Sequence, residues 1–567
     1  MRFNFVSRIR LISGAIVLCA LVLIARLYFL QIVYSSAYKL RADHQYSSPS
    51  EGTFDRGSIF FEDKNGIQTS AATLKSGFML TINPKLIVTP EMVYKKLSAI
   101  FTLDHTVFIQ KATKKNDTYE EIGHRLSVDQ ASSITALKLA GVSLYKEQWR
   151  FYPGATMAAQ TIGFVGYKGD TLAGQYGLES YYEKTLERTT DNLYVNSFAQ
   201  MFSDLGNAVA SNGGEGDVVT TIEPTVQSFL DNELVKVNKQ YSSTLTGGIV
   251  IDPKTGEIFA LGAYPTFDPN TYQTQKNGSA FANPLVENVY EMGSIVKALT
   301  MASGLDAGVV NASSTYNDTG SEVVDGKKIS NYDGVARGVT NMQTVLNQSL
   351  NLGAAYVAGK LGNTLFTKYL LNFGLGQKSG IDLPNEAHGL VNNLNSPRQI
   401  EHATASYGQG IAISPIVMAR ALSALANGGV LVTPHVTKEI DYIDGRKNVT
   451  PVTAGLQVIK KTTADKITQM LVNVVDQALL NGTVKLSNYS IAAKTGTAQI
   501  ANPTGGYYPD RYLHSFFGYF PAYNPRFLVF MYTVYPKGVE YASHTLTAPF
   551  IDVAKFLINY YQIPPDR

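Results

Sequence analysis

The chain has 567 residues, of which 45% are hydrophobic and 16% are charged, a composition typical of a globular protein with a large core and roughly three or four domains. The formal net charge of +3, without a basic run that contains interleaved aromatic residues, argues against a nucleic-acid partner. Cys19 is the only cysteine, which excludes a disulfide within the chain and a cysteine-based metal site, and we expect neither a metal nor another cofactor.

The N-terminal segment predicts a membrane anchor. Three arginines within residues 1–10 precede an uncharged stretch from Leu11 to Ala25, and apolar residues continue to Val33. About 20 apolar residues cross a bilayer, and basic residues on one flank keep that flank in the cytoplasm. We therefore expect a cytoplasmic tail (1–10), a single transmembrane helix (11–33) and an extracytoplasmic body. A cleaved signal peptide is the alternative, but no small-residue cleavage site follows the apolar stretch.

Residues 42–216 predict a mixed α/β domain without an obvious catalytic motif, which we interpret as a non-catalytic pedestal. Strand patterns flank the turn at Asn65-Gly66, and helical patterns follow from Pro90 to Ile100 and from Ala131 to Ala140. Arg56 and Glu179 are interpreted as a structural ion pair.

The polar stretch from Ser211 to Gly216 marks the expected boundary to the last domain, residues 217–567. Its sequence predicts, in order, a helix from Pro224 to Val237, a hairpin of 247–252 with 257–262, a hairpin of 516–520 with 527–535, and a helix from Ala548 to Gln562 with Thr547 as N-cap. The turn of the first hairpin contains Lys254-Thr255-Gly256, which we interpret as structural.

The first candidate for catalysis is a Ser-x-x-Lys motif at Ser294. Gly293 allows a tight turn before an apolar run with helical spacing, so Ser294 is expected near a helix N-terminus with Lys297 one turn away on the same face. A lysine whose pKa is lowered by burial or by a second cation can take the serine's proton, and backbone N–H groups at a helix end can stabilise an oxyanion. The motif also occurs at Ser36 and Ser143, so by itself it does not exclude an ordinary solvated helix pair.

The second candidate is Ser349-x-Asn351, which occurs once in the chain. A hydroxyl and a carboxamide two residues apart can both face a cleft from a loop, where Ser349 could relay a proton and Asn351 could hold Lys297 and a substrate amide. A helix cap or a turn is the alternative for such a pair.

The third candidate is Lys494-Thr495-Gly496, followed by Thr497, within a run of small and apolar residues typical of a strand. Gly496 would let a ligand backbone lie close to the strand, and the two threonine hydroxyls would bind a carboxylate. Lys494 would add positive charge for that carboxylate and lower the pKa of Lys297.

In this order, the three motifs resemble the active-site motifs of penicillin-binding proteins and serine β-lactamases. The resemblance to class B penicillin-binding proteins also covers further segments, among them Arg56-Gly57, Tyr152-Pro153-Gly154, Gly177-Leu178-Glu179, Asp217 to Thr221, Ser406 to Gly410 and Ser515 to Tyr519. Those proteins are monofunctional peptidoglycan D,D-transpeptidases on a single membrane anchor. Met292 and Ala298 depart from the pattern, since the family usually has proline at both positions.

The resemblance implies an α+β fold in which a transmembrane helix precedes a dimerisation-type pedestal and a transpeptidase domain (217–567) with an antiparallel sheet flanked by helices. It implies that Ser294 attacks the D-Ala-D-Ala end of a stem peptide with Lys297 as base, and that the backbone N–H groups of Ser294 and Thr497 form the oxyanion hole. β-Lactams would acylate the same serine.

The implied partners are peptidoglycan stem peptides, β-lactams, and a membrane-embedded glycan polymerase of the shape, elongation, division and sporulation (SEDS) type, together with other divisome or elongasome proteins of the bacterial cytoplasmic membrane. We expect a role in septation rather than elongation. A membrane-anchored serine β-lactamase or β-lactam sensor shares the motifs, and a non-catalytic divisome scaffold is a further alternative. The large pedestal and the absence of a deacylating carboxylate signal favour a synthase, and the intact reactive residues argue against a scaffold.

Overall fold

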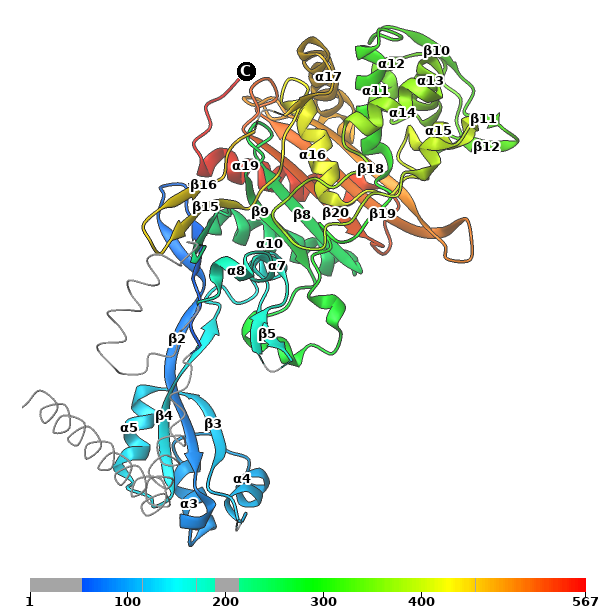
Figure 1. The fold of residues 1–567 in the computed structure, drawn as a ribbon. Helices are drawn as coiled ribbons and strands as arrows, with labels where there is room; N and C mark the ends of the chain where they lie inside the picture. Colours follow the sequence, from blue (N-terminus) through cyan, green and yellow to red (C-terminus); the bar gives the residue numbers. More distant parts are fainter. Residues whose placement is uncertain (1–53, 115, 170, 189–213, 454) are drawn as a thin grey trace, which may run out of the picture. The chain divides into compact units, whose positions relative to one another are not determined.

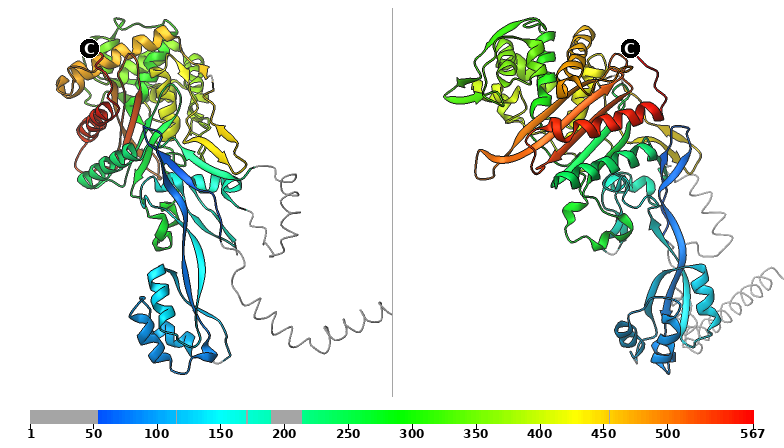
Figure 2. Two further views of the ribbon diagram at one scale, coloured as in Figure 1. Left: turned by 90° about the vertical axis from the view of Figure 1, so that its left-hand side faces the viewer. Right: turned by 180° about the vertical axis from the view of Figure 1, so that it is seen from behind.

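The computed structural model describes residues 54–567 except 115, 170, 189–213 and 454 (Figures 1 and 2). The chain divides into two compact units, whose described parts are mainly 75–149 for unit 1, and 56–74, 150–188 and 214–567 for unit 2. This division differs from the predicted boundary at 216, because 56–74 and 150–188 pack with the C-terminal residues. The predicted tail and anchor lie outside the described residues. Among the helices that are described, none is long and apolar enough to cross a membrane.

Unit 1 is a small α/β layer. Its strands are β3 (Glu120–Leu126) and parts of β2 (Gln68–Ile82) and β4 (Val142–Phe151), and its helices are α3 (Pro90–Ser98), α4 (His105–Ala112) and α5 (Val128–Ala136). Leu80, Leu97 and Phe108 form its core with little or no exposure. The two predicted helices are confirmed. The second begins earlier than predicted, at Val128, because Ser127 and Gln130 form a capping box, and it ends at Ala136 instead of the predicted Ala140.

The centre of unit 2 is a five-stranded antiparallel sheet in the order β18-β19-β20-β8-β9 (Figure 1). Its strands are β8 (Leu245–Ile251), β9 (Ile258–Tyr264), β18 (Ala492–Ala501), β19 (Tyr507–Phe520) and β20 (Phe527–Val534). Both predicted hairpins are confirmed, and Lys254-Thr255-Gly256 lies in the β8–β9 turn as predicted. Successive residues of β8 point to opposite faces, so Ile249 joins one core and Val250 the other.

Helices cover both faces of this sheet. On one face, α10 (Pro224–Tyr241) and α19 (Thr547–Tyr560) lie side by side (Figure 2). The rings of Phe229 and Phe556 stack between them, with 4.1 Å between their centroids. The predicted N-cap of α19 is wrong by one residue: Leu546 occupies the cap and Thr547 is the first helical residue. The other face packs against the helical part of unit 2, which includes α11 (Val296–Asp306), α16 (Pro415–Ala426) and α17 (Lys461–Asn473).

The remaining elements of unit 2 surround this framework. The helices are α6 (Ala159–Ile162), α7 (Gly177–Tyr181), α8 (Glu183–Leu186), α12 (Met342–Asn347), α13 (Asn351–Leu361), α14 (Asn363–Asn372), α15 (Gln399–Ala405) and α18 (Ala542–Thr545). The small hairpins are β5 (Val165–Lys168) with β6 (Thr171–Gly174), β10 (Thr315–Asp318) with β13 (Gly338–Asn341), β11 (Ser321–Val324) with β12 (Lys327–Ser330), and β14 (Val430–Leu431) with β17 (Leu456–Gln457). A second sheet has the strand order β16 (Lys447–Val449), β15 (Thr437–Tyr442), β7 (Gly216–Thr220) and β1 (Ile59–Glu62). Strand β1 also pairs with β2.

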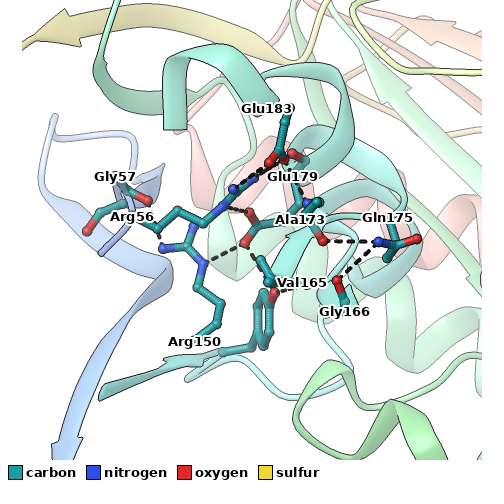
Figure 3. Close-up of polar contacts among 12 residues, drawn as sticks. Arg56, Gly57, Arg150, Val165, Gly166, Ala173, Gln175, Glu179 and Glu183 are labelled. Carbon is teal, nitrogen blue, oxygen red and sulfur yellow. Dashed lines mark hydrogen bonds and ion pairs between the residues drawn. The ribbon is translucent and has the colours of Figure 1, made fainter. Parts of the chain in front are cut away.

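A buried ion cluster joins the separate sequence segments of unit 2 (Figure 3). The carboxylate of Glu179, which is fully buried, accepts from Arg56 Nε at 2.7 Å and from Arg150 Nε at 2.6 Å. Arg56 also binds Glu183, and Arg150 Nη1 donates to the Gly57 carbonyl at 2.7 Å. The two guanidinium groups hold the pKa of Glu179 below its usual value despite burial. The predicted Arg56–Glu179 pair is therefore confirmed as part of a larger structural cluster.

Replacing Glu179 with glutamine is expected to lower the free energy of unfolding by about 3–5 kcal/mol, because two buried guanidinium groups lose their shared counter-charge. Urea unfolding of the full chain measures this loss. Asp465→Asn is the control, since its pair with Lys461 is solvent-exposed and contributes little. Equal effects of the two substitutions would contradict a stabilising role for the buried cluster.

Candidate active site

Ser294 lies in a short 3₁₀ turn, η5 (Gly293–Ile295), that leads directly into α11. The structure thus places it near a helix N-terminus, as the sequence predicts. Its side chain is half-buried, and its hydroxyl makes no hydrogen bond within the described part of the chain. Lys297 follows one turn later and is only 1% exposed. This arrangement places an unengaged hydroxyl one turn before a buried amine.

Glycines hold the turn before Ser294 between two other backbone segments. Gly293 has a φ of +63°, and a Cβ atom there would lie 2.6 Å from the Thr497 carbonyl oxygen of β18. On the other side, the Gly293 N–H donates to the Gly408 carbonyl at 3.2 Å, and a Cβ at Gly408 would lie 2.2 Å from the Gly293 carbonyl oxygen. Larger residues at either position would push Ser294 away from β18. Sequence reasoning did not assign this role to Gly408, although it lies in the Ser406 to Gly410 segment of the family resemblance.

The lack of a side chain at Gly496 makes room for protein atoms. A Cβ atom there would lie 2.3 Å from Ser515 Oγ and 2.6 Å from the Met292 carbonyl oxygen. Ser515 Oγ in turn donates to that carbonyl at 2.7 Å. The space that the missing side chain leaves is therefore filled by protein atoms, and it lets β18 lie against the turn that carries the nucleophile. Ser515 is a positioning residue that the sequence indicated only through the family resemblance.

The two lysines of the site meet at the hydroxyl of Ser349. Lys297 Nζ donates to the Ser349 carbonyl oxygen at 2.6 Å and lies 3.2 Å from Ser349 Oγ, and Lys494 Nζ lies 3.0 Å from the same Oγ. Lys494 is 2% exposed. Within the described residues, neither ammonium group pairs with a carboxylate. Three distant parts of the sequence thus converge on one oxygen atom.

Burial, together with one neighbouring charge, sets the protonation state of the two lysines. Burial lowers the pKa of Lys297 well below its usual value, and the charge of Lys494 lowers it further. Burial alone lowers the pKa of Lys494 to about 7. A neutral Lys297 amine can accept a proton at neutral pH, and a protonated Lys494 can bind an anion. The site therefore combines a base and a cation a few ångströms apart.

Ser349 and Asn351 lie where α12 ends and α13 begins. Ser349 has a φ of +54°, a left-handed conformation that typically costs ~1–3 kcal/mol in a residue other than glycine. The strained turn is tolerated while it directs the hydroxyl to both lysines. Asn351 is the first residue of α13, and its amide donates to the Ser330 carbonyl at 2.8 Å. Asn351 was expected to hold Lys297, but no hydrogen bond joins these two described residues.

Thr495 and Thr497 lie two residues apart on β18, so both side chains are on the same face of the strand, and both are half-buried. Thr497 Oγ1 accepts from the Ala542 N–H at 3.1 Å, which leaves its own proton available for a ligand. The carbonyl of Thr495 accepts from Lys494 Nζ at 3.1 Å. Two hydroxyls and one ammonium group thus lie along one strand, a donor set suited to a carboxylate.

The Ser-x-x-Lys sequence at Ser143 lacks the geometry of the Ser294 motif. Ser143 and Lys146 lie in β4, where residues three apart point to opposite faces. Ser36 lies outside the described residues.

Comparison with known proteins identifies the family. The family model of the penicillin-binding protein transpeptidase domain matches residues 246–555, and that of the penicillin-binding protein dimerisation domain matches residues 55–214. The chain belongs to the penicillin-binding protein transpeptidase family. It is a serine-type transpeptidase, and Ser294, Lys297, Ser349 and Lys494 all fall within the transpeptidase match.

Relatives of this transpeptidase match it over most of their length. Stage V sporulation protein D of Bacillus subtilis (strain 168) is 30% identical over 95% of this chain and 83% of its own. Peptidoglycan D,D-transpeptidase FtsI of Buchnera aphidicola subsp. Schizaphis graminum is 25% identical over 98% and 95% of the two chains. Penicillin-binding protein 3 of Mycobacterium tuberculosis, solved in complex with aztreonam, has the same fold, with a TM-score of 0.68, 23% identity, and 90% and 97% coverage.

Replacing Lys494 with methionine is expected to stabilise the transpeptidase, most strongly at or below pH 7. Folding lowers the pKa of Lys494 from 10.5 to about 7, so a charged lysine in the folded state is disfavoured by up to about 5 kcal/mol below pH 7, and this cost disappears towards pH 10.5. Urea unfolding of the variant and of the unchanged enzyme at pH 6.5 and pH 9.5 measures the difference. Lys254→Met, in the exposed turn, is the control. A stabilisation that does not change with pH would show that Lys494 does not carry the buried charge.

Proposed function

We propose that this transpeptidase cross-links peptidoglycan stem peptides as a D,D-transpeptidase. The observation that carries the proposal is the meeting of Lys297 and Lys494 at the Ser349 hydroxyl, with Ser294 one turn before Lys297 and its own hydroxyl free of hydrogen bonds in the described structure. The name of the Buchnera aphidicola relative, peptidoglycan D,D-transpeptidase, supports the same reaction.

In the acylation step, the neutral amine of Lys297 takes the proton of Ser294, whose Oγ attacks the penultimate D-Ala carbonyl. The terminal carboxylate of the peptide lies along β18 at Thr495, Thr497 and Lys494. Backbone N–H groups of Ser294 and Thr497 stabilise the oxyanion, typically by ~2.7–4 kcal/mol per donor. The C–N bond then breaks, and the leaving D-Ala amine receives a proton through Ser349, which contacts both lysines.

The second step forms the cross-link. The amine of a neighbouring stem peptide attacks the ester carbonyl of the acyl-enzyme, a new C–N bond forms, and the ester C–O bond breaks. Lys297 and Ser349 return a proton to Ser294 Oγ and remove one from the attacking amine, so the enzyme is regenerated. β-Lactams enter the first step and leave Ser294 acylated.

The lifetime of a penicillin adduct separates this function from a β-lactamase or a sensor. We expect full-length enzyme labelled with fluorescent penicillin to retain the label through gel electrophoresis. In a separate assay, we expect unlabelled enzyme with nascent glycan strands to release D-alanine and form cross-linked peptides. Rapid turnover of penicillin without cross-linking would identify a β-lactamase. A stable adduct without cross-linking would identify a sensor, and no labelling at all a scaffold.

We further propose that residues 11–33 anchor the enzyme in the bacterial cytoplasmic membrane with residues 1–10 in the cytoplasm. The apolar composition of that stretch supports this placement. A transpeptidase needs glycan strands made by another enzyme, so a membrane-embedded polymerase of the SEDS type and other divisome or elongasome proteins are the proposed partners. A fluorescent fusion distinguishes the proposed septal role, which places it at midcell, from elongation along the side wall.

A further inference from the structure

His514 is a buried histidine that the proposed chemistry does not use. It lies on β19 directly opposite Thr497 of β18 and is fully buried. Its ring bridges two points of the segment 540–545: Nδ1 lies 2.9 Å from Thr545 Oγ1, and Nε2 lies 2.9 Å from the Glu540 carbonyl oxygen. One imidazole thus ties both ends of this short segment to the sheet.

The same segment contacts the substrate-binding strand. Its Ala542 N–H donates to Thr497 Oγ1 at 3.1 Å. Tyr541, the preceding residue, packs edge-to-face against Tyr332 with 5.7 Å between ring centroids. Tyr332 lies two residues after Ser330, and the Ser330 carbonyl accepts a hydrogen bond from the Asn351 side chain. The segment 540–545 therefore connects the Lys494–Thr497 side of the site with the Ser349–Asn351 side.

The hydrogen bonds define one state of the imidazole. A carbonyl oxygen only accepts, so Nε2 carries the proton that binds Glu540. Burial lowers the pKa of His514 to about 4, which keeps the ring neutral, so Nδ1 accepts from the Thr545 hydroxyl. The Thr545 hydroxyl also lies 3.2 Å from the Ala542 carbonyl oxygen, and with its proton directed to the nearer Nδ1 both ring nitrogens are paired. A phenylalanine of similar size would fill the space but bind neither the Glu540 carbonyl nor the Thr545 hydroxyl.

We propose that His514 is a positioning residue for recognition of the substrate carboxylate, an inference that rests on the proposed function. The imidazole holds the 540–545 segment, the Ala542 N–H of that segment holds the Thr497 oxygen as an acceptor, and the Thr497 proton is thereby directed towards the bound carboxylate. His514 acts through Thr497 and touches neither Ser294 nor the two lysines. The effect of removing it therefore falls on binding of the anion rather than on the rate of acylation.

The test compares penicillin with its methyl ester, which lacks the anionic carboxylate, on full-length enzyme and on His514→Phe. Stopped-flow labelling separates the dissociation constant of the first complex from the acylation rate constant. We expect His514→Phe to weaken binding of penicillin about 10-fold with little change in the acylation rate constant, and to leave binding of the ester unchanged. His514→Gln, which keeps a side-chain N–H donor, is expected to recover part of the loss.

An equal loss for penicillin and for its ester would show a general structural role and overturn the proposal, as would unchanged penicillin binding. Thr545→Val, which removes the hydroxyl that contacts Nδ1 and the Ala542 carbonyl oxygen, is the second variant and is expected to reproduce the selective loss if His514→Phe does not fold. The unchanged enzyme distinguishes failure of this proposal from failure of the proposed function. Rapid hydrolysis of penicillin by the unchanged enzyme would contradict the transpeptidase function. The ratio of the dissociation constants for penicillin and its ester would still test the role of His514.

Discussion

Replacement of Ser294 with alanine is expected to abolish covalent labelling by penicillin and to reduce cross-linking on the order of 10⁶-fold, the loss typical of removing a serine nucleophile. Among the described Ser-x-x-Lys sequences, only that of Ser294 places the serine one helical turn before a buried lysine. Labelling with fluorescent penicillin, followed by mass spectrometry of the adduct, measures the loss. Because the Ser294 hydroxyl is half-buried and makes no hydrogen bond within the described structure, thermal stability should change little.

Ser143→Ala provides the matched control. Ser143 belongs to a Ser-x-x-Lys sequence but lies exposed on β4, so its removal should leave labelling unchanged. Persistent labelling of the Ser294→Ala variant at another residue would contradict the assignment of the nucleophile.

Replacement of Lys297 with methionine is expected to slow acylation by ~10²–10⁴-fold, the usual contribution of a general base. Methionine preserves much of the side-chain volume, which limits the cavity in this fully buried position. The rate constant of penicillin acylation, measured by stopped flow, is the appropriate quantity, because cross-linking also depends on the later steps. Acylation at an unchanged rate would exclude Lys297 as the base.

The pH dependence provides an independent check on the same residue. Lys297 must be neutral to accept a proton, so acylation by the unchanged enzyme should rise with pH through the lowered pKa of Lys297. Lys494 must be charged to bind the carboxylate, so affinity for penicillin should fall as pH rises through about 7. The Lys297→Met variant should lose the rise of the acylation rate with pH and keep the fall in affinity for penicillin above about pH 7. Lys146→Met, at an exposed strand position, should keep both.

Much of the local structure follows from patterns of neighbouring residues. The turn at Asn65-Gly66, the hairpin of β8 and β9 and the long helix α10 all occur where the sequence predicts them. Alternation of side chains at a period of two and helical spacing at 3.6 are properties of a few consecutive residues, so they are visible without the fold. The interpretation of Lys254-Thr255-Gly256 as a turn succeeded for the same reason.

Contacts between distant residues escaped such reasoning. The approach of Gly408 to Gly293, the hydrogen bond of Ser515 to Met292 and the bridge of His514 to the segment 540–545 join parts of the chain that share no local pattern. The grouping of 56–74 and 150–188 with the C-terminal residues is of the same kind. In each case the partner is chosen by packing across the fold rather than by sequence spacing.

By itself, the sequence determined the family, the order of the three motifs and the residue types that can perform serine acylation, because these reside in short fixed strings such as Ser294 to Lys297. Only the tertiary structure decided that Lys297 and Lys494 share one hydroxyl, that Asn351 binds Ser330 instead, and that Gly496 makes room for protein atoms. The physical reason is that a lysine pKa depends on burial and on the nearest charges, and both are set by atoms that come from distant parts of the chain.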